Sequence, residues 1–222
     1  MMPPGVETDS GTERLIASLA AHVPPVPPRF IGRRIALGTA GGGVVSLGLV
    51  FALFGARPDL PQAMFGFAFW MKWAYTISLG LVAVAATVRL ARPTAGSFRP
   101  LWPLAVPILL LGALGVEELS RTPMRDWLSM WLGGSWAECP WRVLLLAIPI
   151  FLGLLWSFRK LAPTDLRAAG AAAGLAAGAW AATIYCLHCD EFAAVFVLTW
   201  YSIGILLAAG LGAVLGPRVL RW

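Results

Sequence analysis

Residues 166–185 read LRAAGAAAGLAAGAWAATIY, and Arg167 is the only charged side chain among them. A bilayer core about 30 Å thick is crossed by roughly 20 apolar residues, because a helix rises 1.5 Å per residue. The stretch therefore has the length and composition of a membrane-spanning helix. Gly170, Gly174 and Gly178 recur at every fourth position and predict a flat face against which another helix of the same bundle packs.

Apolar blocks of similar length occur along the rest of the chain. Of its 222 residues, 59% are hydrophobic and 13% are charged, which leaves too little polar surface for a water-soluble domain. We expect spans at 35–54, 70–88, 101–119, 143–158, 166–185 and 192–215. The predicted fold is an all-α, six-helix integral membrane bundle over residues 35–217, between a segment at 1–34 and a tail at 218–222.

Lysine and arginine predict the orientation, because cytoplasmic flanks of spans retain them. With six spans, most basic residues share one face with both termini, and the opposite face keeps few: Arg57, Arg121, Arg125 and Arg142. Both termini are therefore expected in the cytoplasm of a bacterium, in a multi-pass inner-membrane protein. Flanks that face the anionic lipid of the bilayer explain the net charge of +6, so we expect no direct binding of nucleic acid.

The segment before the first span predicts a short amphipathic helix. Ser10 and Glu13 have the spacing of a capping box, and the residues that then share one helical face are Leu15, Ile16, Leu19 and Val23. The prolines of PPVPP end this helix. A helix this short is marginal alone in water, so we expect it to fold against the membrane surface or against a cytoplasmic protein.

The turn after residue 185 carries the reactive side chains. Residues 185–192 read YCLHCDEF, and Cys139 lies at the end of another loop on the same predicted outer face. A bacterial periplasm is oxidising, so disulfides persist there. A C-x-x-C motif fits a redox pair, part of a metal site, or two unrelated small residues. Haem attachment is excluded, because Asp190 and not histidine follows Cys189.

Two arrangements of these side chains remain open from the residues alone. Cys139 can form a structural disulfide with Cys186 or with Cys189. Alternatively, Cys139, His188 and Cys189 can bind a thiophilic metal ion, with Glu138 or Asp190 completing the ligand set.

Lys72 is the candidate for an ionisable residue inside the bilayer. It lies near the outer start of its span, so we expect its ammonium to reach the lipid–water interface by snorkelling. The other spans carry no central acid or base, which argues against a transporter.

An ordered set of motifs runs through the whole chain: LIASLAAHVPPVPP, RPDL, FWMKW, RLARP, SWAECPWRVLLLAIP, LHCDEFAAVFVLTWY and LGPRVLRW. In this set the chain resembles the NrsF-type negative regulators of extracytoplasmic-function (ECF) sigma factors, which are six-span anti-sigma proteins of the bacterial inner membrane. The resemblance implies an ECF sigma factor as partner and no cofactor. It also implies that an outer cysteine pair, matching Cys139 and Cys189, senses oxidants or heavy metals, with Cys186 as an additional thiol.

The expected mechanism is a transmembrane switch. The N-terminal helix, through Leu15, Ile16 and Leu19, holds the sigma factor until the outer thiols react. The alternative is an enzyme, a membrane thiol–quinone oxidoreductase with Cys186 and Cys189 as its active pair and Cys139 as resolving thiol. That chemistry usually needs a second cysteine pair, which the sequence lacks.

Overall fold

The computed structural model describes residues 10–21, 27, 29–92 and 99–221. They fall into two compact units, Met1–Phe30 and Ile31–Trp222. The first unit contains helix α1 (Ser10–Ala21), so the predicted N-terminal helix is present. The side chains of residues 11–21 are all exposed, and Val23 lies outside the described residues.

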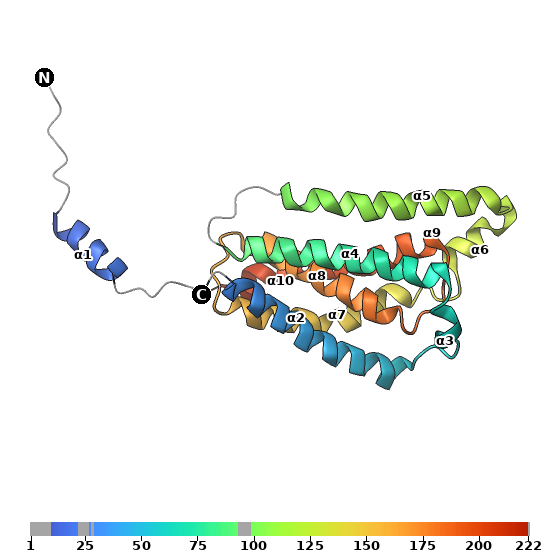
Figure 1. The fold of residues 1–222 in the computed structure, drawn as a ribbon, viewed down its shortest axis with the longest axis horizontal. Coiled ribbons are helices and arrows are strands. Elements are labelled where there is room, and N and C mark those ends of the chain that lie inside the picture. Colours follow the sequence, from blue (N-terminus) through green and yellow to red (C-terminus); the bar gives the residue numbers. More distant parts are fainter. Residues whose placement is uncertain (1–9, 22–26, 28, 93–98, 222) are drawn as a thin grey trace, which may run out of the picture. The chain divides into compact units, whose positions relative to one another are not determined.

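The second unit contains the long helices (Figure 1). The first three spans are α2 (Phe30–Leu49) with the π-turn η1 (Val50–Phe54), α4 (Phe67–Leu90), and η2 (Arg99–Leu104) with α5 (Ala105–Arg121). The others are α7 (Cys139–Phe158), α8 (Leu166–Tyr185), and α9 (Ala194–Phe196) with η4 (Val197–Tyr201) and α10 (Ser202–Val219). Three short helices lie in loops: α3 (Leu60–Ala63), η3 (Met124–Asp126) and α6 (Trp127–Leu132).

Among the described residues, six helical segments are long and apolar enough to cross a membrane. This confirms the predicted all-α fold and agrees with the predicted six spans. Several spans begin earlier than predicted. The fourth starts at Cys139 and not at Val143, because proline at position 140 is tolerated in the first turn of a helix, where its missing N–H is not needed. Cys139 is therefore part of a helix and not of a loop.

Helix α8 lies at the centre of the bundle, in contact with α10, α4 and α7. Of the 18 most apolar consecutive residues of α8, 78% are buried, whereas the corresponding share for the third span is 11%. The third span lies at the edge of the bundle, beside α4 and α9 (Figure 1). A Cβ atom added to Gly170 or Gly174 would overlap the backbone of α10. The predicted glycine face is therefore confirmed as a packing surface inside the bundle.

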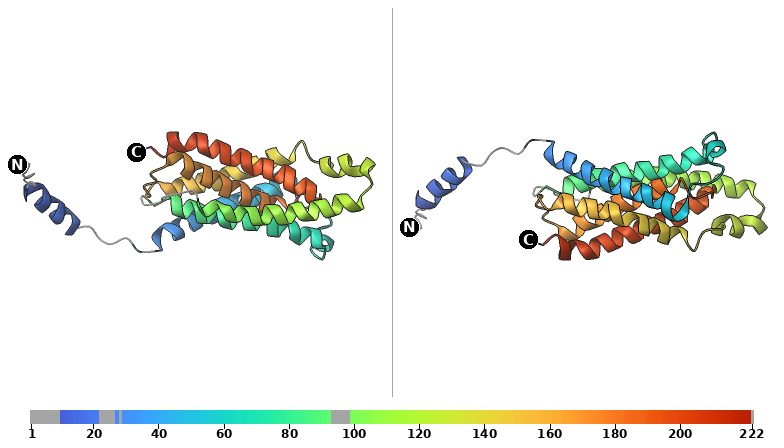
Figure 2. Two further views of the ribbon diagram at one scale, coloured as in Figure 1. Left: turned by 90° about the horizontal axis from the view of Figure 1, so that it is seen from above. Right: turned by 90° about the horizontal axis from the view of Figure 1, so that it is seen from below.

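The two ends of the bundle are formed by different parts of the chain (Figure 2). At one end, α2 begins and α10 ends; we call this the terminal end. The opposite end consists of residues 55–66, 122–138 and 186–193, and we call it the thiol end. The predicted outer turn and the predicted outer loops all meet at the thiol end.

Candidate functional site

The three predicted sensor cysteines come together at the thiol end. Cys139 is the first residue of α7, and Cys186 and Cys189 lie in the turn that follows α8. All three are buried and carry free thiols. The thiols of Cys139 and Cys189 lie within hydrogen-bonding reach of each other. Cys186 lies beside Thr76, and Tyr201 is a neighbour of both Cys186 and Cys189. The geometry thus makes Cys139 and Cys189 the closely associated pair.

The two cysteines of the turn differ in acidity. The hydrogen bond from Cys139 and the nearby Lys72 ammonium lower the pKa of Cys189 to about 6, although burial opposes the change. Burial raises the pKa of Cys186 to about 11. Because the thiolate is the reactive form of cysteine, Cys189 is the stronger nucleophile of the two at neutral pH.

Lys72 is hydrogen-bonded to the turn that carries Cys189. Its side chain is fully buried, and Nζ donates hydrogen bonds to the carbonyl oxygens of Cys189 (2.9 Å) and Glu191 (2.6 Å). The ammonium also lies 5.3 Å from the ring centroid of Phe192. The expectation that Lys72 snorkels to the interface is therefore wrong. The two carbonyl oxygens of the turn take the place of the water molecules that the ammonium loses when it is buried.

His188 has both ring nitrogens engaged. Nε2 lies 3.1 Å from Nη1 of Arg142, and Nδ1 lies 3.1 Å from the carbonyl oxygen of Gly55. A guanidinium can only donate and a carbonyl can only accept, so these partners assign the proton of a neutral ring to Nδ1. Arg142 also pairs with Glu138.

The predicted metal ligands are not gathered into one set. Within the described ranges, no group of three or more His, Cys, Asp or Glu side chains is arranged to hold a metal ion. The structure brings Cys139 and Cys189 together and directs the free nitrogen lone pair of His188 toward Arg142. A metal ion on the two sulfurs would gain His188 as a ligand only if that hydrogen bond were exchanged.

The loop after the first span is hydrogen-bonded to the turn that carries Cys189. The Arg57 guanidinium makes two 2.7 Å hydrogen bonds to the Asp59 carboxylate and donates a third, of 3.3 Å, to the Cys189 carbonyl. The same pairing raises the pKa of Arg57 and lowers that of Asp59. The backbone N–H of Arg57 donates to the carbonyl of Leu187 at 3.2 Å. The turn is thus held by groups from both the first loop and α4.

The loop that leads to Cys139 is fastened to the same turn. Glu191 Oε1 accepts a 2.6 Å hydrogen bond from the backbone N–H of Gly134. Trp131 Nε1 donates to Thr199 Oγ1 at 3.1 Å, and Trp200 Nε1 donates to the carbonyl of Trp131 at 2.8 Å. These bonds fix the position of Cys139 relative to Cys189.

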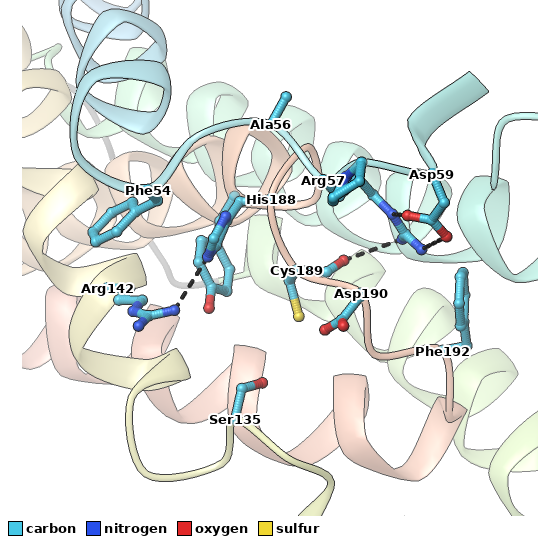
Figure 3. Close-up of a pocket in the computed structure, with 12 residues that line it drawn as sticks. Phe54, Ala56, Arg57, Asp59, Ser135, Arg142, His188, Cys189, Asp190 and Phe192 are labelled. Atoms are coloured by element: carbon cyan, nitrogen blue, oxygen red, sulfur yellow. Dashed lines mark hydrogen bonds and ion pairs between the residues drawn. The ribbon is translucent and has the colours of Figure 1, made fainter. Parts of the chain in front are cut away.

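A pocket of about 710 Å³ is present at the thiol end (Figure 3). It is lined by Phe54, Ala56, Arg57, Pro58, Asp59, Ser135, Arg142, Tyr185, His188, Cys189, Asp190 and Phe192. Cys189 is the only cysteine among these lining residues, so a molecule in the pocket meets Cys189 before it meets the other thiols.

The chain matches the family model of the negative regulator of sigma F, NrsF, over residues 19–222. It belongs to the NrsF family. It is 37% identical over 211 residues to the probable anti-sigma-F factor NrsF of Azospira oryzae, an alignment that covers 95% of this chain and 99% of the relative. It is 39% identical over 221 residues to the anti-sigma-F factor NrsF of Caulobacter vibrioides, covering 98% and 100%. No solved structure matches the chain.

NrsF proteins are regulators, so membership of the family supports an anti-sigma role with a sigma factor as partner, and it favours the regulator over the thiol–quinone oxidoreductase. The predicted contact residues Leu15, Ile16 and Leu19 lie in α1, and each is more than half exposed.

Sequence reasoning missed several residues of this site, above all Lys72, Arg57, Arg142, Tyr185 and Glu191. Two of them left a signal in the sequence. Arg57 stands two residues before Asp59, and Arg142 stands four residues after Glu138, which is the spacing of a helical ion pair.

Proposed function

We propose that this protein is an anti-sigma factor of the bacterial inner membrane that holds an ECF sigma factor and releases it when its periplasmic cysteines react with an oxidant or a thiophilic metal ion. One observation carries the proposal. The buried thiols lie at one end of a six-span bundle, and the chain enters the first span, directly after the α1 segment, at the other end.

Helix α1 supports the capture of a partner. Its apolar side chains Leu15, Ile16 and Leu19 are 58%, 55% and 62% exposed. Such a helix commonly binds by laying its apolar face into a groove of another protein. A sigma factor held in this way would be withheld from RNA polymerase at the membrane.

Helix α7 supports a route for the signal. It begins at Cys139 and ends at Phe158, at the terminal end. There Arg34 Nε donates a 2.9 Å hydrogen bond to the carbonyl of Ser157, and Ser157 Oγ donates one of 2.9 Å to the carbonyl of Arg34. A displacement of α7 at Cys139 would therefore act on the start of α2, the helix that follows the α1 segment.

The energy of the thiol reaction is sufficient for such a switch. A disulfide typically contributes about 2–4 kcal/mol, and about 2.7 kcal/mol changes a two-state ratio a hundredfold. A disulfide between Cys139 and Cys189 would join the start of α7 to the turn between α8 and α9. A thiophilic cation bound by the same two sulfurs would join the same elements.

A pull-down from membranes tests the proposal. We expect the full chain to retain a sigma factor, and a variant without residues 1–30 to lose it. Cys139→Ser and Cys189→Ser should retain the sigma factor even after oxidant is added, because they cannot form the bond. Unchanged capture by the truncated chain would contradict the role of α1. Release from both serine variants would contradict the role of the thiols.

A further inference from the structure

The pocket at the thiol end presents one sulfur to its interior. Figure 3 shows the Cys189 sulfur, the Arg142 guanidinium and the Ser135 hydroxyl directed toward the same space. Cys139, which is within hydrogen-bonding reach of Cys189, does not line the pocket. Cys189 is therefore the thiol that a ligand in the pocket would contact, and Cys139 is the thiol next to it outside the lining.

Two hydroxyl groups of the pocket lack acceptors. Tyr185 is fully buried, and its Oη lies within reach of the Arg142 guanidinium but has no acceptor for its own proton among the described residues. The Ser135 Oγ has no hydrogen-bond partner among those residues. A buried hydroxyl left unpaired costs about 1–3 kcal/mol. Tyr185 also lies beside Arg142, Cys139 and Cys189. The unused donors therefore point to an oxygen-rich ligand bound next to the Cys189 sulfur.

The charges of the lining favour a neutral ligand. Arg57 and Arg142 are matched by Asp59 and Asp190, the Cys189 thiolate is matched by the nearby Lys72 ammonium, and the hydrogen bonds of His188 fit its neutral form. An oxyanion would meet the two carboxylates, and a metal ion would meet the two guanidinium groups. Neither kind of ion has a net opposite charge to attract it.

The size and walls of the pocket favour an organic group on the ligand. The volume of about 710 Å³ far exceeds the roughly 30 Å³ that one water occupies. Phe54 and Phe192 are aromatic members of the lining. A ligand with an apolar part would bury that part against these rings.

We propose that the pocket binds a neutral organic hydroperoxide, ROOH, and that Cys189 is the thiol it oxidises first. This rests on the proposed function of the thiols as the sensor. The Cys189 thiolate sulfur forms a bond to the terminal oxygen of ROOH, the O–O bond breaks, and the alkoxide takes up a proton from solvent and leaves as the alcohol. The product is a sulfenic acid on Cys189.

Cys139 completes the reaction as the resolving thiol. Its sulfur forms a bond to Cys189 Sγ, the S–O bond of the sulfenic acid breaks, and the hydroxyl leaves with the Cys139 proton as water. One hydroperoxide is reduced by two electrons, and two thiols are oxidised to one disulfide. Tyr185, Ser135 and Arg142 act as positioning residues that donate hydrogen bonds to the peroxide oxygens.

Trapping of the sulfenic acid tests the order of attack. Purified full-length protein is treated with cumene hydroperoxide and dimedone, and the labelled cysteine is found by mass spectrometry. We expect label on Cys189 in the Cys139→Ser, Cys186→Ser double variant, and none on Cys139 or Cys186 in Cys189→Ser. Label on Cys139 or Cys186 in that second variant would overturn the assignment, as would unlabelled Cys189 in the first.

Tyr185→Phe tests the pocket itself. The change removes only a hydroxyl whose proton has no acceptor, and we expect it to slow oxidation by cumene hydroperoxide about tenfold, the effect of one hydrogen bond in the transition state. Alkylation of Cys189 by iodoacetamide, which needs no such donor, should keep its rate. Tyr75→Phe is the matched control, because Tyr75 is buried in α4 and bonds Ser202 outside the pocket. It should leave both rates unchanged.

Two further results would overturn the proposal: equal slowing of both reagents by Tyr185→Phe, or faster oxidation by hydrogen peroxide than by cumene hydroperoxide. These measurements need no sigma factor. A failure here, together with release of the sigma factor by a thiophilic cation, would leave the proposed anti-sigma function standing. Normal hydroperoxide chemistry without sigma capture would reject only that function.

Discussion

The Lys72 ammonium and the carbonyl oxygen of Cys189 are joined by a 2.9 Å hydrogen bond that lies entirely inside the protein. Through this bond, helix α4 holds the backbone of the residue whose sulfur is the more acidic of the turn's two thiols. The same ammonium provides a positive charge near that sulfur. One side chain therefore both positions Cys189 and favours its ionised form.

Lys72→Met should weaken both effects. The Glu191 carbonyl would lose the Lys72 donor at a cost of about 1–3 kcal/mol, and the Cys189 carbonyl would keep only its bond from Arg57, so we expect a lower Tm in detergent. The midpoint of the pH profile for iodoacetamide alkylation of Cys189 should move upward, because a positive neighbour is lost. Lys72→Arg keeps the charge and should shift that midpoint less. Identical profiles for wild type and Lys72→Met would show that the ammonium does not influence the thiol.

The acidity of Cys189 predicts a pH dependence of its reactivity and of stability. Alkylation should rise around the folded pKa of about 6, well below the ordinary thiol range. Since this pKa is lowered on folding, its contribution to the free energy of unfolding is fully present above the unfolded pKa of about 8.5 and is lost as pH falls through about 6. Thermal unfolding of wild type and Cys189→Ser across pH 5–9 measures the difference. A Tm difference independent of pH would rule out this linkage.

The apolar face of α1 should decide sigma capture. Leu15→Asp with Leu19→Asp should lower affinity at least thirtyfold, because two charges would enter an apolar contact. Ala17→Asp is the matched control, since a helix of 3.6 residues per turn places position 17 on the opposite side. Binding of the sigma factor to protein in nanodiscs gives the comparison. Equal losses from both variants would mean that charge near the helix, and not its apolar face, sets the affinity.

The close contact of α8 with α10 should be intolerant of side chains. Gly174→Leu places atoms where the backbone at Ala208 already lies, so we expect a loss of several kcal/mol or a failure to fold. Gly43→Leu is the control, because nothing lies within 4 Å of a Cβ there. Size-exclusion profiles and Tm in detergent report the outcome. A normal Tm for Gly174→Leu would contradict the packing described.

The contact of Arg34 with Ser157 should matter for signal passage but not for thiol chemistry. Arg34→Gln removes the guanidinium that bonds the Ser157 and Trp156 carbonyls and covers the Trp156 ring. We expect disulfide formation at its normal rate but a reduced release of the sigma factor. Arg33→Gln keeps the same change of net charge and serves as the control. Normal release from Arg34→Gln would exclude this contact from the route.

The spans and the glycine face could be predicted because they depend on local quantities, the length of apolar runs and the spacing of small residues. The roles of Lys72 and His188 depend on partners that are distant in sequence. Lys72 bonds residues more than one hundred positions away, and His188 bonds Gly55 and Arg142 on other elements. From its charge alone, Lys72 was expected at the lipid–water interface, because the sequence does not show that the carbonyls of Cys189 and Glu191 will accept its hydrogen bonds.

The hydrogen bond between the Gly134 N–H and the Glu191 carboxylate fixes the loop a few residues before Cys139. Gly133 adopts a φ of 57°, and a Cβ there would lie 2.7 Å from the Glu191 carboxylate, so this point of the loop is anchored. Only residues 135–138 separate the anchor from the helix that begins with Cys139. These four residues form turns and no helix, so a residue inserted there would lengthen the connection between the anchor and Cys139. We expect the length of this four-residue connection to limit how far Cys139 can move from Cys189.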